Sequence, residues 1–205
     1  GVLNFGHNNS RMTEAMINYM QNDGVLHSLD MQTTAKAEFM QAFTDIILKP
    51  RNMPHRMQFM GPTGTNAVEA AMKLARRATG RQNIVAFSHG FHGMTLGALA
   101  ATANEYFRGA SGVPLQHVTH ESFDGEHAGM DSLAMLEAMR ERYLDPSSGL
   151  GKPAAFLLET VQAEGGVNVA GKAWMQALAS LAKELGAVLI VDDIQVGCGR
   201  TGSYF

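Results

Sequence analysis

Apolar positions recur along this chain in two different periods. Five segments repeat them every three or four residues, which is typical of amphipathic helices: 12–20, 39–47, 67–78, 132–143 and 174–185. Three short apolar runs lie between these segments and predict buried strands: 83–87, 154–158 and 187–191. Strands that alternate with helices of this length indicate βαβ units, so we expect an α/β fold with a mostly parallel sheet and flanking helices.

The third predicted helix has an apolar face made mostly of alanine. We expect Ala71, Leu74 and Ala75 on its packing side, together with Ala67 and Ala78. Glu69 and Lys73 stand four residues apart on the opposite side, which is the spacing of an ion pair in water.

The first 52 residues contain helices and loops but no predicted strand. Methionines line the face of the helix over 12–20, and they are interpreted as flexible core fillers without a chemical role. We expect 1–52 to be part of, or a linker to, a smaller domain, and 53–205 to form part of the main α/β domain.

The composition argues against several classes of partner. A net charge of −3 provides no basic surface for nucleic acid or an anionic membrane. No apolar stretch is long enough to span a bilayer. Cys198 is the only cysteine, so an intrachain disulfide is excluded and a reducing cytoplasm is the expected location.

A glycine-containing turn, 61–66, stands immediately before the third predicted helix. Glycines let the backbone approach a ligand closely, and the free N–H groups of a helix N-terminus attract anions. A phosphate or carboxylate site at Gly64 and Thr65 follows, although an ordinary capped turn explains the segment equally well. The Lys-Ser/Thr pair of a P-loop is missing after the second glycine.

Each predicted strand ends in polar residues, where open α/β sheets hold their chemistry. Asp192 follows the strand over 187–191 and could hold a metal ion or the protonated ring nitrogen of a cofactor. Glu159 and Glu164 follow the strand over 154–158 and could serve acid–base or ion-pair roles, but for either one alone a solvated loop carboxylate is the simpler interpretation.

The strand over 83–87 is followed by a loop in which Phe91 could present its ring to a planar ligand. His89 and His92 are three residues apart in the same loop. Without a third ligand this spacing does not predict a metal site, because loop histidines in ordinary hydrogen bonds are far commoner. Taken together, the loops suit a phosphorylated, planar, nitrogen-containing ring: Gly64 and Thr65 for the phosphate, Phe91 for the ring face and Asp192 for the ring N–H⁺.

At these residues the chain closely resembles the class III aminotransferases, which use pyridoxal 5′-phosphate (PLP) on a fold-type I scaffold. The resemblance rests on four ordered motifs: 63–76 for the phosphate loop and its helix, 91–93 for aromatic-His-Gly, 159–166 for Glu-Pro-Val-Gln-Gly-Glu-Gly-Gly, and 192–202 for Asp-Glu-Val-Gln and Gly-Arg-Thr-Gly. Thr160 and Ala163 depart from the third motif. The resemblance implies that 53–205 are an incomplete PLP-binding large domain.

The resemblance also implies a role for each motif residue. Gly64 and Thr65 would bind the phosphate of PLP. Phe91 and Ile194 would cover the two ring faces. Asp192 would pair with the ring nitrogen and Gln195 with the ring 3-oxygen, and Glu164 would be the acid that switches between an arginine and the substrate. The expected cofactor-binding residues are thus Gly64, Thr65, Phe91, Asp192, Ile194 and Gln195. The expected catalytic residues are Asp192 and Glu164.

Within the class, residues 4–9, 27–31, 61–66 and 192–200 resemble the diaminobutyrate-forming enzymes of ectoine biosynthesis. This implies amino transfer from L-glutamate to L-aspartate 4-semialdehyde by a homodimer or higher homo-oligomer. Ornithine, acetylornithine and 4-aminobutyrate remain alternative substrates. A phosphate-binding NTPase and a non-catalytic module are remote alternatives.

The ends of the chain read as the interior of a longer sequence. In the family, the Schiff-base lysine and the switch arginine lie beyond the Gly-Arg-Thr-Gly motif, and no lysine of this chain matches the former. We therefore expect a fragment truncated at both ends, without transaminase activity on its own.

Overall fold

The computed structural model describes residues 3–204. They form two compact units, one of residues 3–59 with 198–204 and the other of residues 60–197. The division of the chain at residue 52 stays a prediction, because compact packing units need not coincide with domains.

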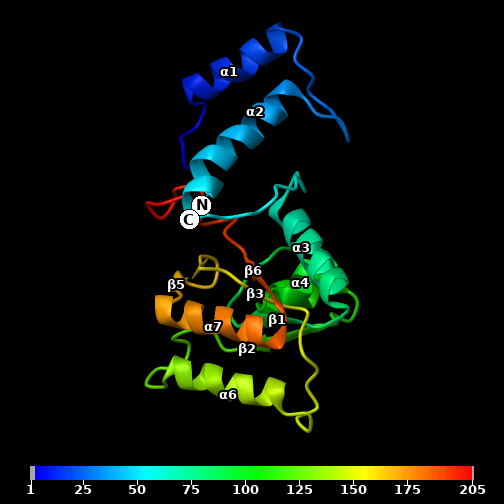
Figure 1. Cartoon of the computed structure of the whole chain (residues 1–205), viewed down its shortest axis with the longest axis vertical. Coiled ribbons are helices and arrows are strands. Elements are labelled where there is room, and N and C mark those ends of the chain that lie inside the picture. The colour runs from blue at the N-terminus through cyan, green and yellow to red at the C-terminus, as the bar shows by residue number, and fades with distance from the viewer. Residues whose placement is uncertain (1–2, 205) are drawn as a thin grey trace. The chain divides into compact units, whose positions relative to one another are not determined.

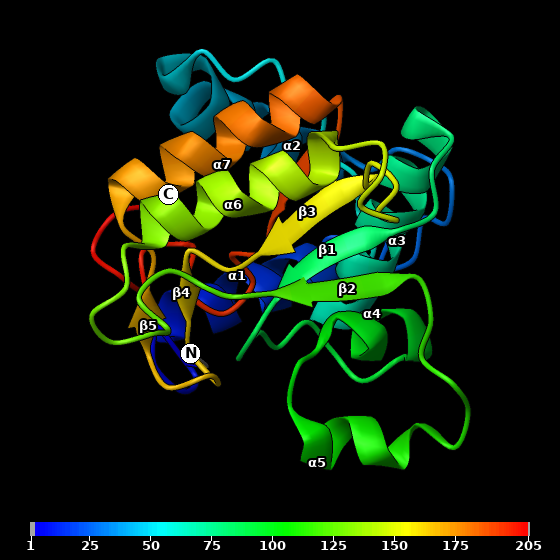
Figure 2. The same ribbon diagram turned by 90° about the horizontal axis from the view of Figure 1, so that it is seen from below.

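The larger unit is built on a parallel sheet, as the alternation of strands and helices predicted (Figure 2). The strand order is β2 (Val118–Glu121), β1 (Ile84–Phe87), β3 (Ala155–Leu158) and β6 (Val188–Val191). All three pairings are parallel, so the carboxyl ends of the four strands meet at one edge of the sheet. Beyond this edge, β4 (Val161–Gln162) and β5 (Asn168–Val169) form a short antiparallel pair.

Helices cover both faces of the sheet. One face packs against α6 (Ser132–Leu144) and α7 (Lys172–Leu185), which lie side by side (Figure 1). The other face packs against α3 (Gly64–Thr79) and the short α4 (Leu96–Ala101). A single further turn, α5 (Glu105–Arg108), follows α4. The sheet and its flanking helices confirm the predicted fold class.

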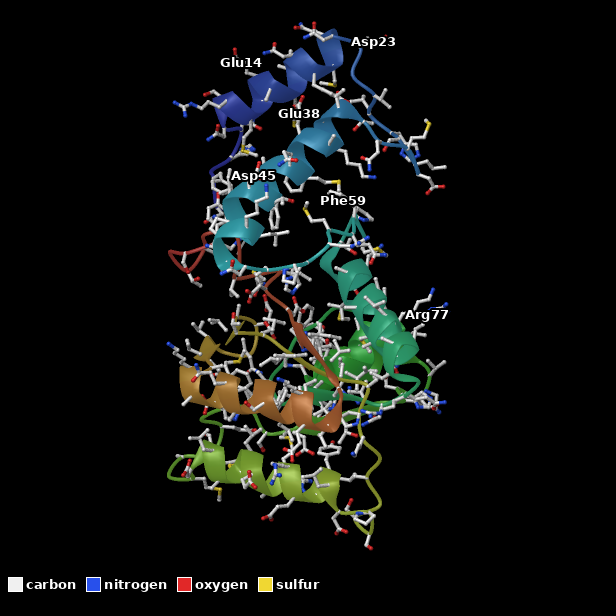
Figure 3. The ribbon with its side chains drawn as sticks, viewed as in Figure 1. Glu14, Asp23, Glu38, Asp45, Phe59 and Arg77 are labelled. Atoms are coloured by element: carbon white, nitrogen blue, oxygen red, sulfur yellow. The ribbon has the colours of Figure 1, made fainter. Side chains whose placement is uncertain are left out.

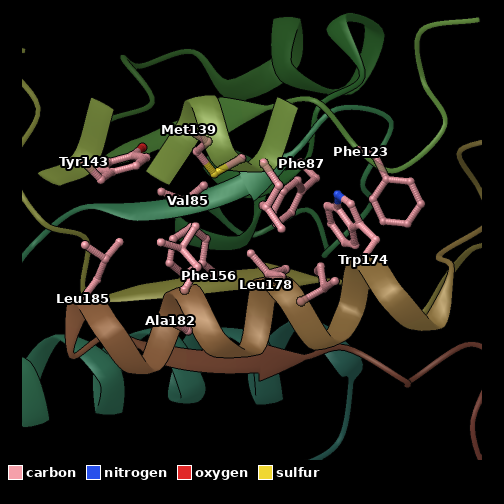
Figure 4. Packing of buried hydrophobic residues seen from close by; sticks show 13 residues of the cluster. Val85, Phe87, Phe123, Met139, Tyr143, Phe156, Trp174, Leu178, Ala182 and Leu185 are labelled. Atoms are coloured by element: carbon pink, nitrogen blue, oxygen red, sulfur yellow. The ribbon is translucent and has the colours of Figure 1, made fainter. Parts of the chain in front are cut away.

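The core between the sheet and α6–α7 contains several aromatic rings in mutual contact (Figure 4). Trp174 of α7 lies edge-on to Phe87 of β1, with ring centroids 5.2 Å apart, and contacts Phe123 at 5.4 Å. Tyr143 of α6 contacts Phe156 of β3 in the same way. Such contacts contribute more than the buried area alone, and they fix the strand ends that carry the polar loops.

The packing face of α3 differs from the predicted one. Val68, Met72 and Ala75 are buried, whereas Leu74 is 60% exposed. Alanine suits either side of a helix, so an alanine-rich pattern does not fix the rotation of the helix about its axis. The two larger side chains, Val68 and Met72, fill the space against β1, β3 and α4 instead.

Strand β6 is less buried than its apolar sequence predicted. Val188 and Val191 are 36% and 42% exposed, because β6 pairs only with β3 among the described residues and forms the edge of the sheet. A buried strand needs a neighbour on both sides and a layer on both faces.

The smaller unit contains α1 (Ser10–Gln21) and α2 (Thr34–Phe43), followed by a π-helical turn (Thr44–Leu48) and a 3₁₀ turn (Lys49–Arg51). Figure 3 shows Glu14 on α1 and Asp45 just beyond α2. Asp45 forms an ion pair with Lys49 at 2.6 Å. Helix α1 buries none of its residues, so the prediction that its methionines fill a core is wrong for the described structure: Met12, Met16 and Met20 are at least half exposed.

Candidate functional site

The loops after β1, β3 and β6 meet at the carboxyl edge of the sheet, and the N-terminus of α3 lies against them. The backbones of the loops after β3 and β6 stay paired just beyond the strands, since the Asp192 N–H donates to the Leu158 carbonyl at 2.7 Å. Three segments that are far apart in the sequence therefore contribute to one polar region.

Asp192 forms the most buried polar contact of this region. Its Oδ2 lies 2.8 Å from Nδ1 of His92, and both side chains are almost fully buried. Its Oδ1 accepts a hydrogen bond from the Ile194 N–H at 3.2 Å. The backbone of His92 is held in turn by the hydroxyl of Thr102 at 3.0 Å. Both carboxylate oxygens are engaged, so the orientation of Asp192 is fixed.

His92 is a functional candidate that sequence reasoning missed. Its spacing from His89 suggested only an ordinary loop histidine, and nothing in the local sequence indicates a partner 100 residues away. The aromatic-His-Gly pattern was a usable signal for the loop as a whole, but it does not identify the contact of the histidine.

Gly64 and Ile194, two of the predicted cofactor residues, lie against each other. A Cβ atom at position 64 would come within 2.9 Å of Ile194 Cγ2. Contacts this short are not tolerated, so a side chain at position 64 would displace Ile194. The small size of glycine, and not an unusual backbone conformation, permits this close approach.

Thr65 is tied to the loop that precedes α4. Its Oγ1 lies 2.6 Å from Oγ1 of Thr95, whose hydroxyl donates to Glu69 at 2.6 Å. Glu69 also accepts from the Ala98 N–H at 2.9 Å, so it binds the first turn of α4. The predicted ion pair of Glu69 with Lys73 is wrong, because a helix N-terminus offers a better-placed set of donors.

Glu159 and Phe91 form a second contact between loops. The Phe91 N–H donates to Oε1 of Glu159 at 2.9 Å, and the Phe91 ring makes an edge contact with Phe107 of α5. Glu159 is only 4% exposed, so its interpretation as a solvated carboxylate is wrong. Burial raises the pKa of Glu159 to about 7, although the Phe91 N–H and nearby His92 oppose the shift.

Gln195 and Glu164 contact each other directly. The Gln195 amide donates to Oε1 of Glu164 at 3.0 Å, on the exposed side of the region. Asp193 points elsewhere and accepts a hydrogen bond from Thr160 at 2.6 Å. The two adjacent acids after β6 therefore have separate partners.

An open cavity of about 530 Å³ adjoins these loops. Phe91, Phe107, Arg108 and Glu164 contribute to its lining. The volume suits a small molecule. Nη1 of Arg108 donates to three carbonyls around the end of α4, which holds this side chain in place. A smaller cavity of about 280 Å³ lies largely against α6, away from the residues described above.

The region suits an organic ligand better than a metal ion. Among residues 3–204, no group of three or more His, Cys, Asp or Glu side chains is arranged to hold a metal. In contrast, the region combines a buried, oriented carboxylate, an aromatic ring and the N-terminus of a 16-residue helix. These features match a cationic ring nitrogen, a planar ring and a phosphate.

Replacing Glu159 with glutamine is expected to remove a pH dependence of stability. The pKa of Glu159 rises from an ordinary 4.5 to about 7 on folding, so between these values the folded state keeps a proton that the unfolded state has released. The free energy of unfolding therefore falls as the pH rises through this window, by roughly 3 kcal/mol for a shift of this size.

The glutamine variant stays neutral and keeps an acceptor for the Phe91 N–H. It should match the parent protein near pH 4.5 and become the more stable of the two above pH 7. Urea unfolding at both pH values measures this change. A stability difference that is independent of pH would contradict it.

The family model "Aminotransferase class-III" matches residues 1–205. Diaminobutyrate–2-oxoglutarate transaminase of Vibrio cholerae is 54% identical over 205 residues, which are 100% of this chain and 49% of that protein. The protein of the same name from Oceanobacillus iheyensis is 49% identical over 205 residues, again 100% of this chain and 47% of that protein. The chain thus spans about half the length of these relatives.

Solved transaminase structures share the fold. An (S)-enantioselective ω-transaminase from Thermomicrobium roseum superimposes with a TM-score of 0.82 at 24% identity, covering 99% of this chain and 47% of that one. A taurine:2-oxoglutarate aminotransferase from Bifidobacterium kashiwanohense, solved with PLP and glutamate, gives 0.79 at 23% identity, covering 98% and 46%. No helix among residues 3–204 has the length and apolar character needed to cross a membrane.

Proposed function

Because the chain belongs to the class III aminotransferases, we propose that it supplies the cofactor-binding loops of an enzyme that moves an amino group from L-glutamate to L-aspartate 4-semialdehyde. The products are L-2,4-diaminobutyrate and 2-oxoglutarate. The observation that carries this substrate pair is the identity of about half over the whole chain to transaminases named for diaminobutyrate and 2-oxoglutarate.

The proposed cofactor is PLP, which when bound serves as an electron sink for the carbanion formed at the substrate carbon. The first N–H groups of α3, at Gly64 and Thr65, have no intrahelical acceptor and carry the positive end of the helix dipole, so they would hold the phosphate. Phe91 and Ile194 would lie on the two faces of the ring.

Asp192 would hold a proton on the ring nitrogen. A carboxylate next to that nitrogen favours its charged form, and an oriented carboxylate needs no rearrangement to do so. The hydrogen bonds from His92 and Ile194 support this role because they fix both oxygens of Asp192. Asp193, which is paired with Thr160, has no part in the proposed mechanism.

Gln195 would hydrogen-bond the 3-oxygen of the ring. A glutamine amide has two N–H groups, so it can donate to this oxygen and to Glu164 together. Glu164 would change partners between the two half-reactions and make room for a substrate carboxylate. The same pocket would then accept both glutamate and a substrate that reacts at its far end.

The proposed enzyme is a cytoplasmic homodimer or higher homo-oligomer. Residues 1–205 contain one cysteine, which suits a reducing compartment, and the resemblance to the class implies that a threonine of a partner subunit reaches the phosphate. Its other partners would be small amino-acid and oxo-acid or aldehyde substrates.

The test is a substrate comparison with the full-length protein loaded with PLP. Formation of L-glutamate from 2-oxoglutarate is followed with L-2,4-diaminobutyrate, ornithine, acetylornithine and 4-aminobutyrate as donors. We expect the highest kcat/KM for diaminobutyrate, by at least about tenfold, since chain length and the second polar group both differ among these donors. A higher value for another donor would reassign the substrate, and no turnover with any donor would reject the proposed function.

A further inference from the structure

One buried ionisable group of the larger unit has no role in the proposed function. Glu159 follows β3 directly and is 4% exposed, although carboxyl groups are almost never this buried without a specific partner. Its carboxyl group makes no hydrogen bond to the side chain of any residue proposed to bind the phosphate or the ring nitrogen. Its partners show instead what it holds in place.

The main partner of Glu159 is a backbone group. Oε1 accepts the N–H of Phe91 at 2.9 Å, which joins the ends of two neighbouring strands, β1 and β3. A loop N–H has no strand partner of its own, so this bond determines where the Phe91 main chain lies. Because the ring is joined to that main chain through a single methylene group, fixing the main chain also limits where the ring can lie.

The next residue of this loop, His92, is also held by hydrogen bonds. The side chain of His92 is bonded to Asp192, and the N–H of His92 to Thr102. Two carboxyl groups therefore fix two consecutive residues, Glu159 through a main-chain N–H and Asp192 through a side chain. Gly90 permits this path, because a Cβ atom there would lie 2.9 Å from the Phe87 carbonyl.

The ring of Phe91 is restrained from one more direction and otherwise adjoins open space. It meets the Phe107 ring at 5.3 Å with an interplanar angle of 71° and contributes to the 530 Å³ cavity. The contact with Phe107 restrains its ring, and the hydrogen bond to Glu159 restrains its main chain. Loss of either contact would allow the ring to tilt.

On this geometry we propose that Glu159 is a positioning residue for PLP: its carboxyl group fixes the main chain of Phe91 and thereby the plane on which the cofactor ring stacks. This inference rests on the proposed function, since it requires PLP as the ligand. Glu159 itself does not touch the cofactor. Its neutral form accepts the same hydrogen bond, which is consistent with the raised pKa of this group.

The test compares Glu159→Leu with Glu159→Gln in the full-length holoenzyme. Leucine removes the acceptor at similar size, whereas glutamine keeps it and removes only the charge. Three quantities are measured: the dissociation constant of PLP, the visible circular dichroism of bound PLP, which reports ring orientation, and kcat. Glu137→Leu on the exposed side of α6 is the matched control.

We expect Glu159→Leu to weaken PLP binding by about 10- to 100-fold, the effect of losing a hydrogen bond to an ionisable group, and to reduce the dichroic band. Glu159→Gln should stay within about threefold of the parent protein. In a Phe91→Ala background, Glu159→Leu should have little further effect, because the glutamate acts through that ring. A purely structural role would instead give additive losses.

Three results would overturn the inference: unchanged PLP affinity and dichroism in Glu159→Leu, a glutamine variant as impaired as the leucine variant, or additive losses with Phe91→Ala. If Glu159→Leu does not fold, Glu159→Ala removes the same acceptor and takes its place in the cycle. Failure of the parent protein to bind PLP would reject the proposed function itself. Normal binding by the parent with any of the three results would reject only the role of Glu159.

Discussion

Replacing Asp192 with asparagine is expected to lower kcat of the full-length enzyme by about 10²- to 10³-fold, the usual cost of removing one preorganised electrostatic contact. Asparagine has nearly the same shape as aspartate, and its one carbonyl oxygen can keep the hydrogen bond from the Ile194 N–H while its NH2 group faces His92. What it lacks is the negative charge that would keep the ring nitrogen protonated. The loss should therefore fall on kcat much more than on substrate KM.

Asp193→Asn provides the matched control for this experiment. It makes the same chemical change one residue further along the chain, but its partner is the hydroxyl of Thr160 and not a buried group of the site. Steady-state kinetics of both variants should separate them by at least about tenfold in kcat. Equal activity of the two variants, or full activity of Asp192→Asn, would show that Asp192 does not act on the ring nitrogen.

Asp192 and Asp193 have different hydrogen-bond partners, and their positions in the sequence do not predict which partner each one has. Alternation along an extended chain indicates that Asp192 and Asp193 face different ways, and both lie at a strand end where ligands bind. The hydrogen bond of Asp192 to His92 spans 100 residues, so no local rule predicts it. The loop positions were predictable from topology, but their individual contacts were not.

Burial explains why Glu159 was misjudged. A carboxylate in a glycine-containing loop is usually hydrated, and its own sequence neighbours support that interpretation. The loop after β1 covers it in the folded chain and supplies the Phe91 N–H. The same reasoning applies to Glu69, whose donors come from the first turn of α4 and not from its own helix.

The predicted strands are those whose apolar runs are continuous. Strand β2, Val118–Glu121, was not predicted because it contains a threonine, a histidine and a glutamate, and all four residues are only partly buried. Helix α4 is six residues long and consists mostly of alanine and glycine, so it is too short to show a helical period. Packing against neighbouring elements, β1 for β2 and both β1 and α3 for α4, stabilises these two elements more than their own sequence pattern does.

Replacing Met72 with alanine is expected to lower the free energy of unfolding by about 2–5 kcal/mol, whereas Leu74→Ala should cost less than about 1 kcal/mol. Met72 is fully buried between α3, the sheet and α4, so its removal leaves a cavity that the surrounding residues cannot fill without shifting. Leu74, two residues further along the same helix, is 60% exposed and already in contact with water.

The two substitutions are closely matched, since both shorten a large apolar side chain of α3 to alanine and both slightly favour the helix. Chemical denaturation of the full-length variants under identical conditions compares them directly. The alanine-rich pattern alone assigns Leu74 to the packing face, so it predicts the reverse order of stability. If Leu74→Ala were the more damaging change, α3 would have to be rotated about its axis, and the contacts of Thr65 and Glu69 with Thr95 would be lost with it, because all of these side chains are placed by the same helix.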